Sequence, residues 1–515
     1  MNKEWMIVTN SKETTQAEIT GVLLRACDAF RGVINPSEYR NYILALLFLK
    51  YISDICKDHY EQHSNQLKTD EAVTHHRLKN KRFMLPDGAS FDDLYEGQTE
   101  SNLGELINIV LERIAEFPEN TAKLSGIFRN VDFNSDRNLG RVGERNERLK
   151  NLLHIFQHLD LRPSKINEDV IGDAYMGLIE RWAFESGKWD GGGEYFTPIQ
   201  VSKLIAKLSM PKSGDSICDP VCGSGSLLVK VAEEVADGNY SLYGQEMNDS
   251  TCTLARINMF LNMEDEARID LCNTLWGPTL VRADKLMQFN IVVGHPPFSL
   301  QWAADKAEYD HFKRFHRGVP PKTKGDFAFI THMVEIALPQ EGRILVVVPH
   351  GVLFRGSSEG RIRQKLIEEN LLDAVIGLPA NLFPSMSIPV AVLVFDRSRE
   401  KGGTNERRQD VLFIDASREF QSGKTRNTLL DEQITRIVET YQQRKNVAKY
   451  AYKANLKEIK SNNFNLNIPR YVNTFEAETA IDIGAVQAEI EQLEVNLVKV
   501  RNKMTECLKE LGVMG

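Results

Sequence analysis

The chain has 515 residues, with 63 Lys and Arg against 71 Asp and Glu, a formal net charge of -8 and a pI near 5.9. This length predicts about three or four structural units, with enough core to need no disulfide or metal for support. A content of 42% hydrophobic and 26% charged residues is typical of a globular protein. The acidic balance excludes a chain coated in positive charge, although a local basic cleft can still contact nucleic acid.

Nothing in the sequence predicts secretion, membrane insertion or a metal centre. Residues 1–10 lack an apolar run behind a basic start, and the longest apolar run, 43–49, is far shorter than the roughly 20 residues of a membrane span. The seven cysteines are scattered, as in a reducing compartment. Cys218 and Cys222 have no second pair at zinc-ligand spacing. We therefore expect a cytoplasmic protein without a metal.

Residues 13–185 are expected to form a helical domain. Apolar residues recur at helical spacing in 43–52, 103–117 and 146–159, and polar, turn-rich segments such as 82–97 separate them. From about residue 187 the pattern changes, and short β-branched runs alternate with helical patterns over about 210 residues. This alternation predicts a doubly wound α/β sheet whose strands are apolar on both faces. We expect strands at 216–218, 241–244, 291–293, 343–348, 372–376 and 390–395, and helices at 199–209, 226–236, 249–262 and 327–338.

The last part of the chain changes character twice. Residues 400–475 are polar and mixed, with an expected exposed loop at 401–405. A heptad seam then runs over almost four heptads, at Val486, Ile490, Leu493, Leu497, Val500, Met504, Cys507 and Leu511. Such a helix either packs on its own domain or joins a partner's helices, and the pattern favours neither.

A glycine loop is the strongest local motif. Residues 219–228 (DPVCGSGSLL) follow an expected strand and open an expected helix. Gly223 and Gly225 allow a sharp turn and a close approach of the backbone to a ligand. The loop lacks the third glycine of a dinucleotide fingerprint and the Lys-Ser/Thr of a P-loop, which favours a nucleoside-type cofactor without a polyphosphate. Glu246 lies about 20 residues farther on, where nucleotide-binding folds place an acid that binds ribose.

Two further segments surround this loop in the sequence. In the segment 291–298 (IVVGHPPF) a buried strand meets two prolines, which give fixed carbonyl acceptors, and Phe298, which gives a stacking surface. An extruded base needs both, but a rigid turn with a core Phe explains the same residues. In 194–198 (EYFTP), Thr197 is expected to cap a helix that has Pro198 at its first position.

Together these motifs, in this order, resemble those of amino-group DNA methyltransferases that use S-adenosylmethionine. The chain resembles the modification (M) subunit of type I restriction-modification enzymes over nearly its whole length. Further matches are 325–329 (GDFAF), 349–355 (PHGVLFR), 377–383 (GLPANLF) and 465–471 (NLNIPRY). The resemblance implies a helical N-terminal domain at 1–185, a Rossmann-like methyltransferase domain at 186–475 and a C-terminal heptad helix for partner docking at 476–515.

The resemblance also implies a role for each matched residue. Tyr195, Phe196, Thr197 and Pro198 would flank the methionine part of the cofactor, and the cofactor loop would comprise Asp219, Cys222, Gly223, Ser224 and Gly225. Glu246 would bind the ribose, and Asn273 and Leu275 would lie beside the cofactor's adenine. The family often has Asp at 273, but the amide oxygen of Asn can still accept a hydrogen bond from an amino group. His295, Pro296, Pro297 and Phe298 match the pocket of the target adenine.

His295 departs from the family pattern, which has Asn, Asp or Ser before Pro-Pro-Phe/Tyr. The Asn oxygen would accept a hydrogen bond from the adenine N6 amine together with the Pro296 carbonyl. Neutral His has one acceptor nitrogen on a bulkier ring, and protonated His has none. The residue is a tolerated natural variant, a natural weakening or an introduced inactivating change. We expect impaired methylation with cofactor binding largely intact.

The resemblance finally implies partners. A specificity (S) subunit, joined by two M subunits, would choose the site on double-stranded DNA. A restriction (R) subunit would complete the nuclease, and the complex would lie in the cytoplasm of a prokaryote.

We expect the mixed, partly basic segment 306–324 to contact DNA phosphates, unless it is a solvated loop. Its basic residues are Lys306, Lys313, Arg314, Arg317, Lys322 and Lys324. The alternatives are an inactive, cofactor-sensing subunit of such a complex and a methyltransferase acting on RNA or protein amides.

Overall fold

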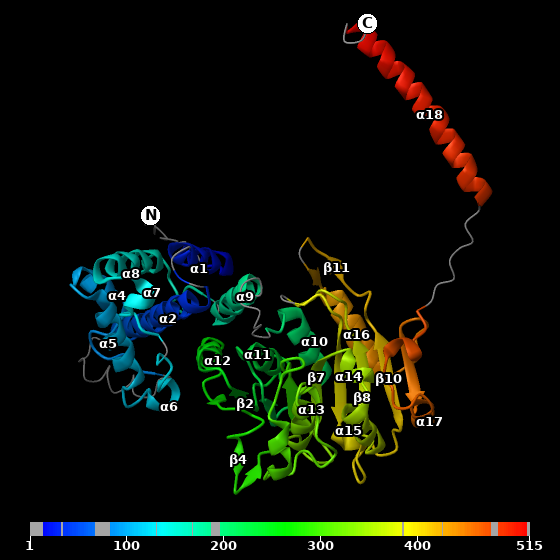
Figure 1. The fold of residues 1–515 in the computed structure, drawn as a ribbon. Coiled ribbons are helices and arrows are strands. Elements are labelled where there is room, and N and C mark those ends of the chain that lie inside the picture. Colours follow the sequence, from blue (N-terminus) through cyan, green and yellow to red (C-terminus); the bar gives the residue numbers. More distant parts are fainter. Residues whose placement is uncertain are drawn as a thin grey trace, which may run out of the picture. The chain divides into compact units, whose positions relative to one another are not determined.

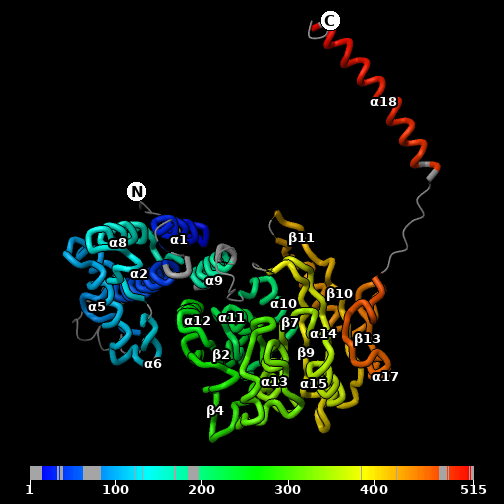
Figure 2. Tube along the Cα trace, viewed as in Figure 1, coloured from blue at the N-terminus to red at the C-terminus, as the bar shows by residue number. Residues whose placement is uncertain are grey.

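A computed structural model describes residues 14–31, 34, 36–66, 83–129, 131–166, 168–186, 196–383, 386–424, 426–474 and 483–511. The chain divides into two units, Met1–Val472 and Asn473–Gly515. Figures 1 and 2 trace the first unit from a helical region into a region built on a large sheet. Within the described residues, no helix is long and apolar enough to cross a membrane.

The N-terminal region is helical, as the sequence predicts. Its helices within the described residues are α1 (Gln16–Phe30), α2 (Pro36–Gln66), α4 (Phe91–Glu96), α5 (Leu103–Ala115), α6 (Thr121–Leu124), α7 (Asp136–Leu139), α8 (Val142–Gln157) and α9 (Glu168–Ser186). The apolar run 43–49 lies in α2 and is completely buried, because the surrounding helices cover it on every side. The segment 82–97, which we expected to be polar and turn-rich, also contains a short helix, α4, which buries Phe91 and Leu94.

Nine strands within the described residues form one mixed sheet in the order β13-β10-β8-β9-β7-β6-β1-β2-β3. Their bounds are β1 (Asp215–Asp219), β2 (Tyr240–Glu246), β3 (Arg268–Leu271), β6 (Ile291–Gly294), β7 (Arg343–Pro349), β8 (Leu372–Gly377), β9 (Val390–Asp396), β10 (Asp410–Asp415) and β13 (Ala451–Asn455). β1 pairs in parallel with β2 on one side and β6 on the other. The chain order reverses there, and α/β sheets bind ligands at such a point.

Helices cover both faces of the sheet (Figure 1). One face packs on α10 (Ile199–Ser209), α11 (Ser226–Ala232), α12 (Asp249–Leu261) and α16 (Asp431–Gln443). The other packs on α13 (Asp326–Glu335), α14 (Gly351–Phe354), α15 (Ser357–Glu368) and α17 (Leu456–Ser461). The helical region packs on α12, where Phe48 meets Phe260 at 4.9 Å between ring centroids. The Tyr175 hydroxyl also donates to the Leu254 carbonyl (2.9 Å).

The six expected strands are confirmed, but the sheet is not wholly parallel. β9 runs antiparallel to both β7 and β8. Burial makes a central strand apolar on both faces whatever its direction, so the pattern could not reveal this. The sequence also missed β3, β10 and β13, and two short hairpins, β4 (Val281–Arg282) with β5 (Lys285–Leu286) and β11 (Gln421–Ser422) with β12 (Asn427–Thr428). β3 and β13 are only partly buried, so their polar residues hide the strand pattern.

In the second unit, the described part of the chain forms one long helix, α18 (Ile483–Glu510). It confirms the helix expected from the heptad seam. Within it the seam side chains are largely exposed, from 43% for Val486 to 66% for Val500.

Candidate functional site

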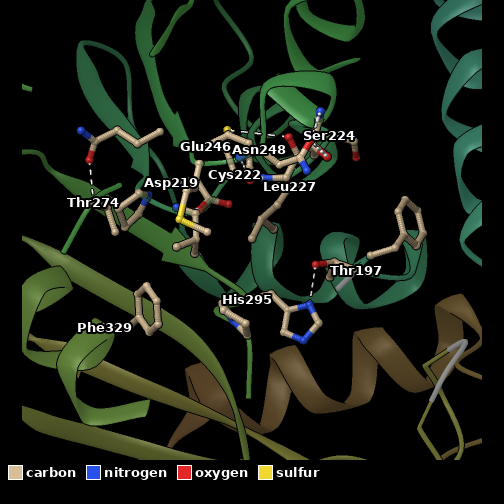
Figure 3. Close-up of a pocket in the computed structure, with 18 of the residues that line it drawn as sticks. Thr197, Asp219, Cys222, Ser224, Leu227, Glu246, Asn248, Thr274, His295 and Phe329 are labelled. Carbon is tan, nitrogen blue, oxygen red and sulfur yellow. Dashed lines mark hydrogen bonds between the residues drawn. The ribbon is translucent and has the colours of Figure 1, made fainter. Parts of the chain in front are cut away.

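A cavity of about 630 Å³ lies at the carboxyl ends of β1, β2, β3 and β6. Segments that directly follow these strands supply most of its wall (Figure 3). Helices α2 and α9 of the N-terminal region complete the wall with Arg40, Ile179, Trp182 and Ala183. The cavity therefore belongs to both halves of the first unit, and it is in the size range of sites for small organic ligands.

The glycine loop bends over one side of this cavity. Gly223 (φ +55°) and Gly225 (φ +78°) both adopt left-handed conformations that side chains disfavour. A Cβ on Gly225 would lie 2.5 Å from Cε of Met259, whereas one on Gly223 would meet nothing within 4 Å. Gly225 is therefore needed for packing behind the loop, and Gly223 for the turn that faces the cavity.

Asp219 ends β1 and is almost fully buried. Burial raises the pKa of its carboxyl group to about 8. The Val221 N–H, which donates to Oδ1 at 2.9 Å, lowers this pKa but does not offset the effect of burial. The nearby Glu246 carboxylate raises this pKa further. A cationic ligand group beside Asp219 would stabilise its ionised form.

Glu246 ends β2 and joins two backbone segments of the site. Its Oε2 accepts from the Gly223 N–H (3.1 Å) and its Oε1 from the Asn248 N–H (2.7 Å). These bonds hold the carboxylate at the rim of the glycine loop. A carboxylate has about four acceptor positions, which suits it to hydroxyl groups of a ligand as well.

Asn273 follows β3, and its amide oxygen is committed to the backbone. Oδ1 accepts from the N–H groups of Leu275 (3.0 Å) and Trp276 (3.2 Å). The sequence predicted that this oxygen would accept a bond from a ligand amine. The structure instead leaves the Nδ2 amide group, 3.3 Å from the sulfur of Met247, as the part of Asn273 suited to a ligand acceptor.

His295 lies at the end of β6, in the buried part of the cavity (Figure 3). Its Nδ1 is 3.0 Å from the hydroxyl oxygen of Thr197. Its ring contacts Phe298 and Phe383, with centroid distances of 5.1 and 4.9 Å. Burial lowers the pKa of His295 to about 3, so the imidazole is neutral near pH 7.

The cavity gathers most of the residues that the sequence singled out. Lining positions among them are Phe196, Thr197, Asp219, Cys222, Gly223, Ser224, Glu246, Asn273, Leu275, His295 and Pro297. Pro198, Gly225, Pro296 and Phe298 lie next to lining residues without lining the cavity themselves. Tyr195 falls outside the described residues. Thr197 is not the N-cap of α10; Pro198 takes that position, and the Thr197 hydroxyl faces His295 instead.

Several lining residues were not predicted from the sequence. Trp276 and Trp302 stack with their ring centroids 5.6 Å apart and their planes at 15°. Trp302 also donates through Nε1 to the Pro321 carbonyl (3.0 Å). The position of Trp276 just after Asn273–Leu275 was a usable signal. Nothing in the sequence connects Arg40 or Trp182 to the cavity, because they come from the helical region.

The expectation for segment 306–324 needs correction at two arginines. Arg314 is buried, pairs with Asp310 and donates to the carbonyl oxygens of Thr274 (2.8 Å) and Leu275 (2.5 Å). Arg317 is buried and pairs with Glu335 and Glu369. Both arginines hold the segment against the protein, so they are unavailable to phosphates. Lys306, Lys313 and Lys322 are exposed.

Comparisons with known proteins agree with these features. The family "N-6 DNA Methylase" matches residues 166–480, and "HsdM N-terminal domain" matches residues 19–156. The type I restriction enzyme MpnII methylase subunit of Mycoplasma pneumoniae is 31% identical, over 94% of this chain and 95% of its own. The MjaVIII methylase subunit of Methanocaldococcus jannaschii is 28% identical, over 97% and 86% of the two chains.

Solved structures show the same likeness. The type I restriction-modification methyltransferase subunit from Streptococcus thermophilus superposes with a TM-score of 0.77 at 31% identity, covering 90% of this chain and all of its own. A modification subunit of a putative type I restriction enzyme from Vibrio vulnificus has a TM-score of 0.66 at 17% identity, over 91% and 99% of the two chains. At that identity the second comparison supports the fold alone.

Proposed function

Because this chain belongs to the family of type I restriction-modification methylase subunits, we propose that its cavity binds S-adenosylmethionine for methylation of adenine N6 in DNA. One observation carries the proposal: the glycine loop after β1, Glu246 after β2 and His295 after β6 line a single cavity. A nucleoside site and an acceptor for a substrate amine therefore adjoin each other, as the transfer of a methyl group between them requires.

The described residues fit this cofactor. Gly223 lets the loop backbone approach the methionine part, beside Cys222 and Ser224, while Gly225 supports the loop from behind. Asp219 offers a carboxyl group to the cationic ammonium and sulfonium groups. Phe196, Thr197 and Pro198 flank the same part, with Tyr195 proposed from the motif alone.

The nucleoside part fits the next two strand ends. Glu246 is held where it can accept hydrogen bonds from the ribose hydroxyls. Asn273 offers Nδ2 to a ring nitrogen of the adenine, because its oxygen already binds the backbone of Leu275 and Trp276. Leu275 also lines the cavity.

The target adenine would enter beside His295, Pro296, Pro297 and Phe298. When bound, S-adenosylmethionine supplies an electrophilic methyl group; N6 forms the new N–C bond as the C–S electron pair moves to sulfur, and N6 then loses a proton to water. If Nδ1–H of His295 donates to Thr197, Nε2 has a lone pair that accepts a bond from the adenine amine. Pro296 and Phe298 do not line the cavity, so their roles are proposed from the motif alone: the Pro296 carbonyl would accept the second amine hydrogen, and Phe298 would give the stacking surface.

His295 is expected to make this transfer slower than Asn would. Its ring is bulkier, and it offers a single acceptor only in the tautomer described above. Cofactor binding, which depends on the glycine loop and Glu246, should be largely intact. The same observation favours a second candidate function, a catalytically inactive subunit that binds the cofactor within the complex.

The setting of the reaction is also part of the proposal. A specificity subunit, binding two copies of this chain, would select the double-stranded DNA site, and a restriction subunit would complete the nuclease. The division into 1–185, 186–475 and 476–515 gives the last segment the docking role. Helix α18 supports this, because the heptad seam lies along nearly the whole helix.

The test compares this chain with and without its specificity partner. Labelled methyl groups from S-adenosylmethionine should enter DNA only when both are present. Calorimetry should show cofactor binding by the chain alone. Cofactor binding without any methyl transfer, even with Asn at position 295, would favour the inactive subunit; no cofactor binding would contradict both functions.

A further inference from the structure

We propose that Asp326 and Arg355 are positioning residues for the target adenine, because they fix the turn that directly follows Pro297 and Phe298. This inference rests on the proposed function. It gives a role to two motifs, GDFAF at 325–329 and PHGVLFR at 349–355, for which the sequence predicted none.

Asp326 binds the backbone of the turn. It is the first residue of α13, it is 2% exposed, and its Oδ1 accepts from the Ser299 N–H at 2.9 Å. The neighbouring Gly325 N–H donates to the Leu300 carbonyl (2.8 Å), from which a Cβ at position 325 would be only 3.1 Å away. The start of α13 thus holds two consecutive residues after Phe298.

Ser299 needs such support. It has a φ of +51°, in the left-handed region that residues other than glycine rarely adopt. This conformation turns the chain directly after Phe298. A turn of this kind persists only where surrounding contacts determine it, and the Asp326 bond to the Ser299 N–H is one of those contacts.

Arg355 in turn holds Asp326. Its guanidinium group donates to Asp326 Oδ2 (2.5 Å), lies 3.0 Å from the Glu359 carboxylate, and reaches the Ser299 hydroxyl at 3.5 Å. The planar fork of arginine can span both carboxylates, whereas lysine has a single point charge. Asp326 therefore keeps one oxygen on Ser299 and the other on Arg355.

The segment 464–466 contacts the chain around Arg355 and helps to hold it in place. Arg363 donates to the carbonyl oxygens of Arg355 (2.8 Å), Val352 (3.1 Å) and Phe464 (2.8 Å). The Leu466 N–H donates to the Leu353 carbonyl (2.9 Å). Another of the motifs without a predicted role, 465–471, thereby helps to place α14 and the arginine that follows it.

Two substitutions test the proposal in the complex with the specificity partner. Asp326→Asn keeps an oxygen for Ser299 but loses the charge that pairs with Arg355; Arg355→Lys keeps the charge but loses the fork. Glu359 still faces position 355 in both variants, so the fold should survive. Glu335→Gln is the control, since Glu335 ends the same helix and pairs with buried Arg317, away from Ser299.

We expect Asp326→Asn and Arg355→Lys to lower kcat for DNA methylation by about 10- to 100-fold, since small misplacement of reacting groups has effects of that size. The Kd for S-adenosylmethionine should change less than about twofold, and Glu335→Gln should leave kcat unchanged. An unchanged kcat in the Asp326 and Arg355 variants, or parallel losses of kcat and cofactor affinity, would overturn the proposal.

A second readout does not depend on methylation. Amide hydrogen exchange of the peptide 296–302 should be faster in both variants than in the parent, and unchanged in Glu335→Gln. If the parent complex proves inactive, the proposed function fails while this measurement still decides the role of the pair. Unchanged exchange would show that Asp326 and Arg355 do not hold the turn.

Discussion

The hydroxyl oxygen of Thr197 lies 3.0 Å from Nδ1 of His295, and both side chains are buried. A neutral imidazole has one N–H and one lone pair, so this contact can select the tautomer. If Nδ1–H donates to Thr197, Nε2 becomes the acceptor. If the Thr197 hydroxyl donates to Nδ1 instead, Nε2 carries the hydrogen of the ring. Nε2 then cannot accept a hydrogen bond from a substrate amine.

Thr197→Val should therefore slow methylation, because valine keeps the shape of threonine but cannot accept from Nδ1–H. We expect a loss of about tenfold, the value of one hydrogen bond of about 1.4 kcal/mol. Thr197→Ser keeps the hydroxyl and is the matched control, expected within about twofold of the parent. The initial rate of methyl transfer by the complex is the measurement, and equal rates for the Val and Ser variants would contradict the tautomer argument.

Cofactor affinity should rise with pH. Burial raises the pKa of Asp219 to about 8, so its carboxyl group is mostly protonated at pH 7. A ligand with cationic groups favours the carboxylate, and binding therefore releases a proton. Affinity should increase by at most about tenfold per pH unit below pH 8 and level off above it.

Asp219→Asn provides the control for this dependence. Asparagine keeps an oxygen for the Val221 N–H but cannot ionise. Calorimetric Kd values from pH 6 to pH 9 should show a smaller slope for the variant than for the parent. Identical slopes would mean that Asp219 does not titrate with binding.

The parallel half of the sheet and much of the cavity wall could be predicted from sequence. Each of β1, β2, β6 and β7 contains a short strand expected from the sequence and is followed by a motif, and parallel strands bring such motifs to one edge. Contacts between distant positions could not be predicted in this way. Thr197 and His295 are 98 residues apart, and the sequence assigned the threonine to a helix cap.

The charge of the segment 306–324 did not predict which of its basic residues are accessible to DNA. Arg314 and Arg317 lie in a basic, aromatic segment typical of a nucleic-acid contact, yet carbonyl groups and carboxylates hold them inside the protein. Burial of a charge depends on partners that fold beside it, and the local sequence does not show those partners.

The exposed lysines of the same segment are the better candidates for DNA. Replacing Lys306, Lys313 and Lys322 with Gln should weaken DNA binding by the complex and reduce its salt dependence. Each lost phosphate contact should reduce the magnitude of the negative slope of log K against log salt by about 0.9. The measurement is a salt titration of DNA affinity. Three exposed lysines elsewhere, Lys445, Lys449 and Lys453, make a matched control triple that should leave the slope unchanged.

Helix α18 should be required for association with the specificity subunit. Deleting residues 481–515 should abolish co-purification and leave cofactor binding intact. A more specific test keeps the helix and replaces Leu493 and Leu497, which both lie on the heptad seam, with lysine. Val495→Lys is the control, because Val495 is equally apolar and 50% exposed but lies off the seam. Co-purification of the truncated chain with its partner would contradict the docking role.

The most direct test of adenine methylation by this chain is the identity of the product that it makes together with its specificity partner. Labelled methyl groups should appear on N6 of adenine, and His295→Asn should raise the rate while changing the cofactor Kd less than about twofold. Equal rates for the two chains would contradict the role assigned to His295. Label on another atom, or no label in DNA from either chain, would contradict adenine methylation at this site.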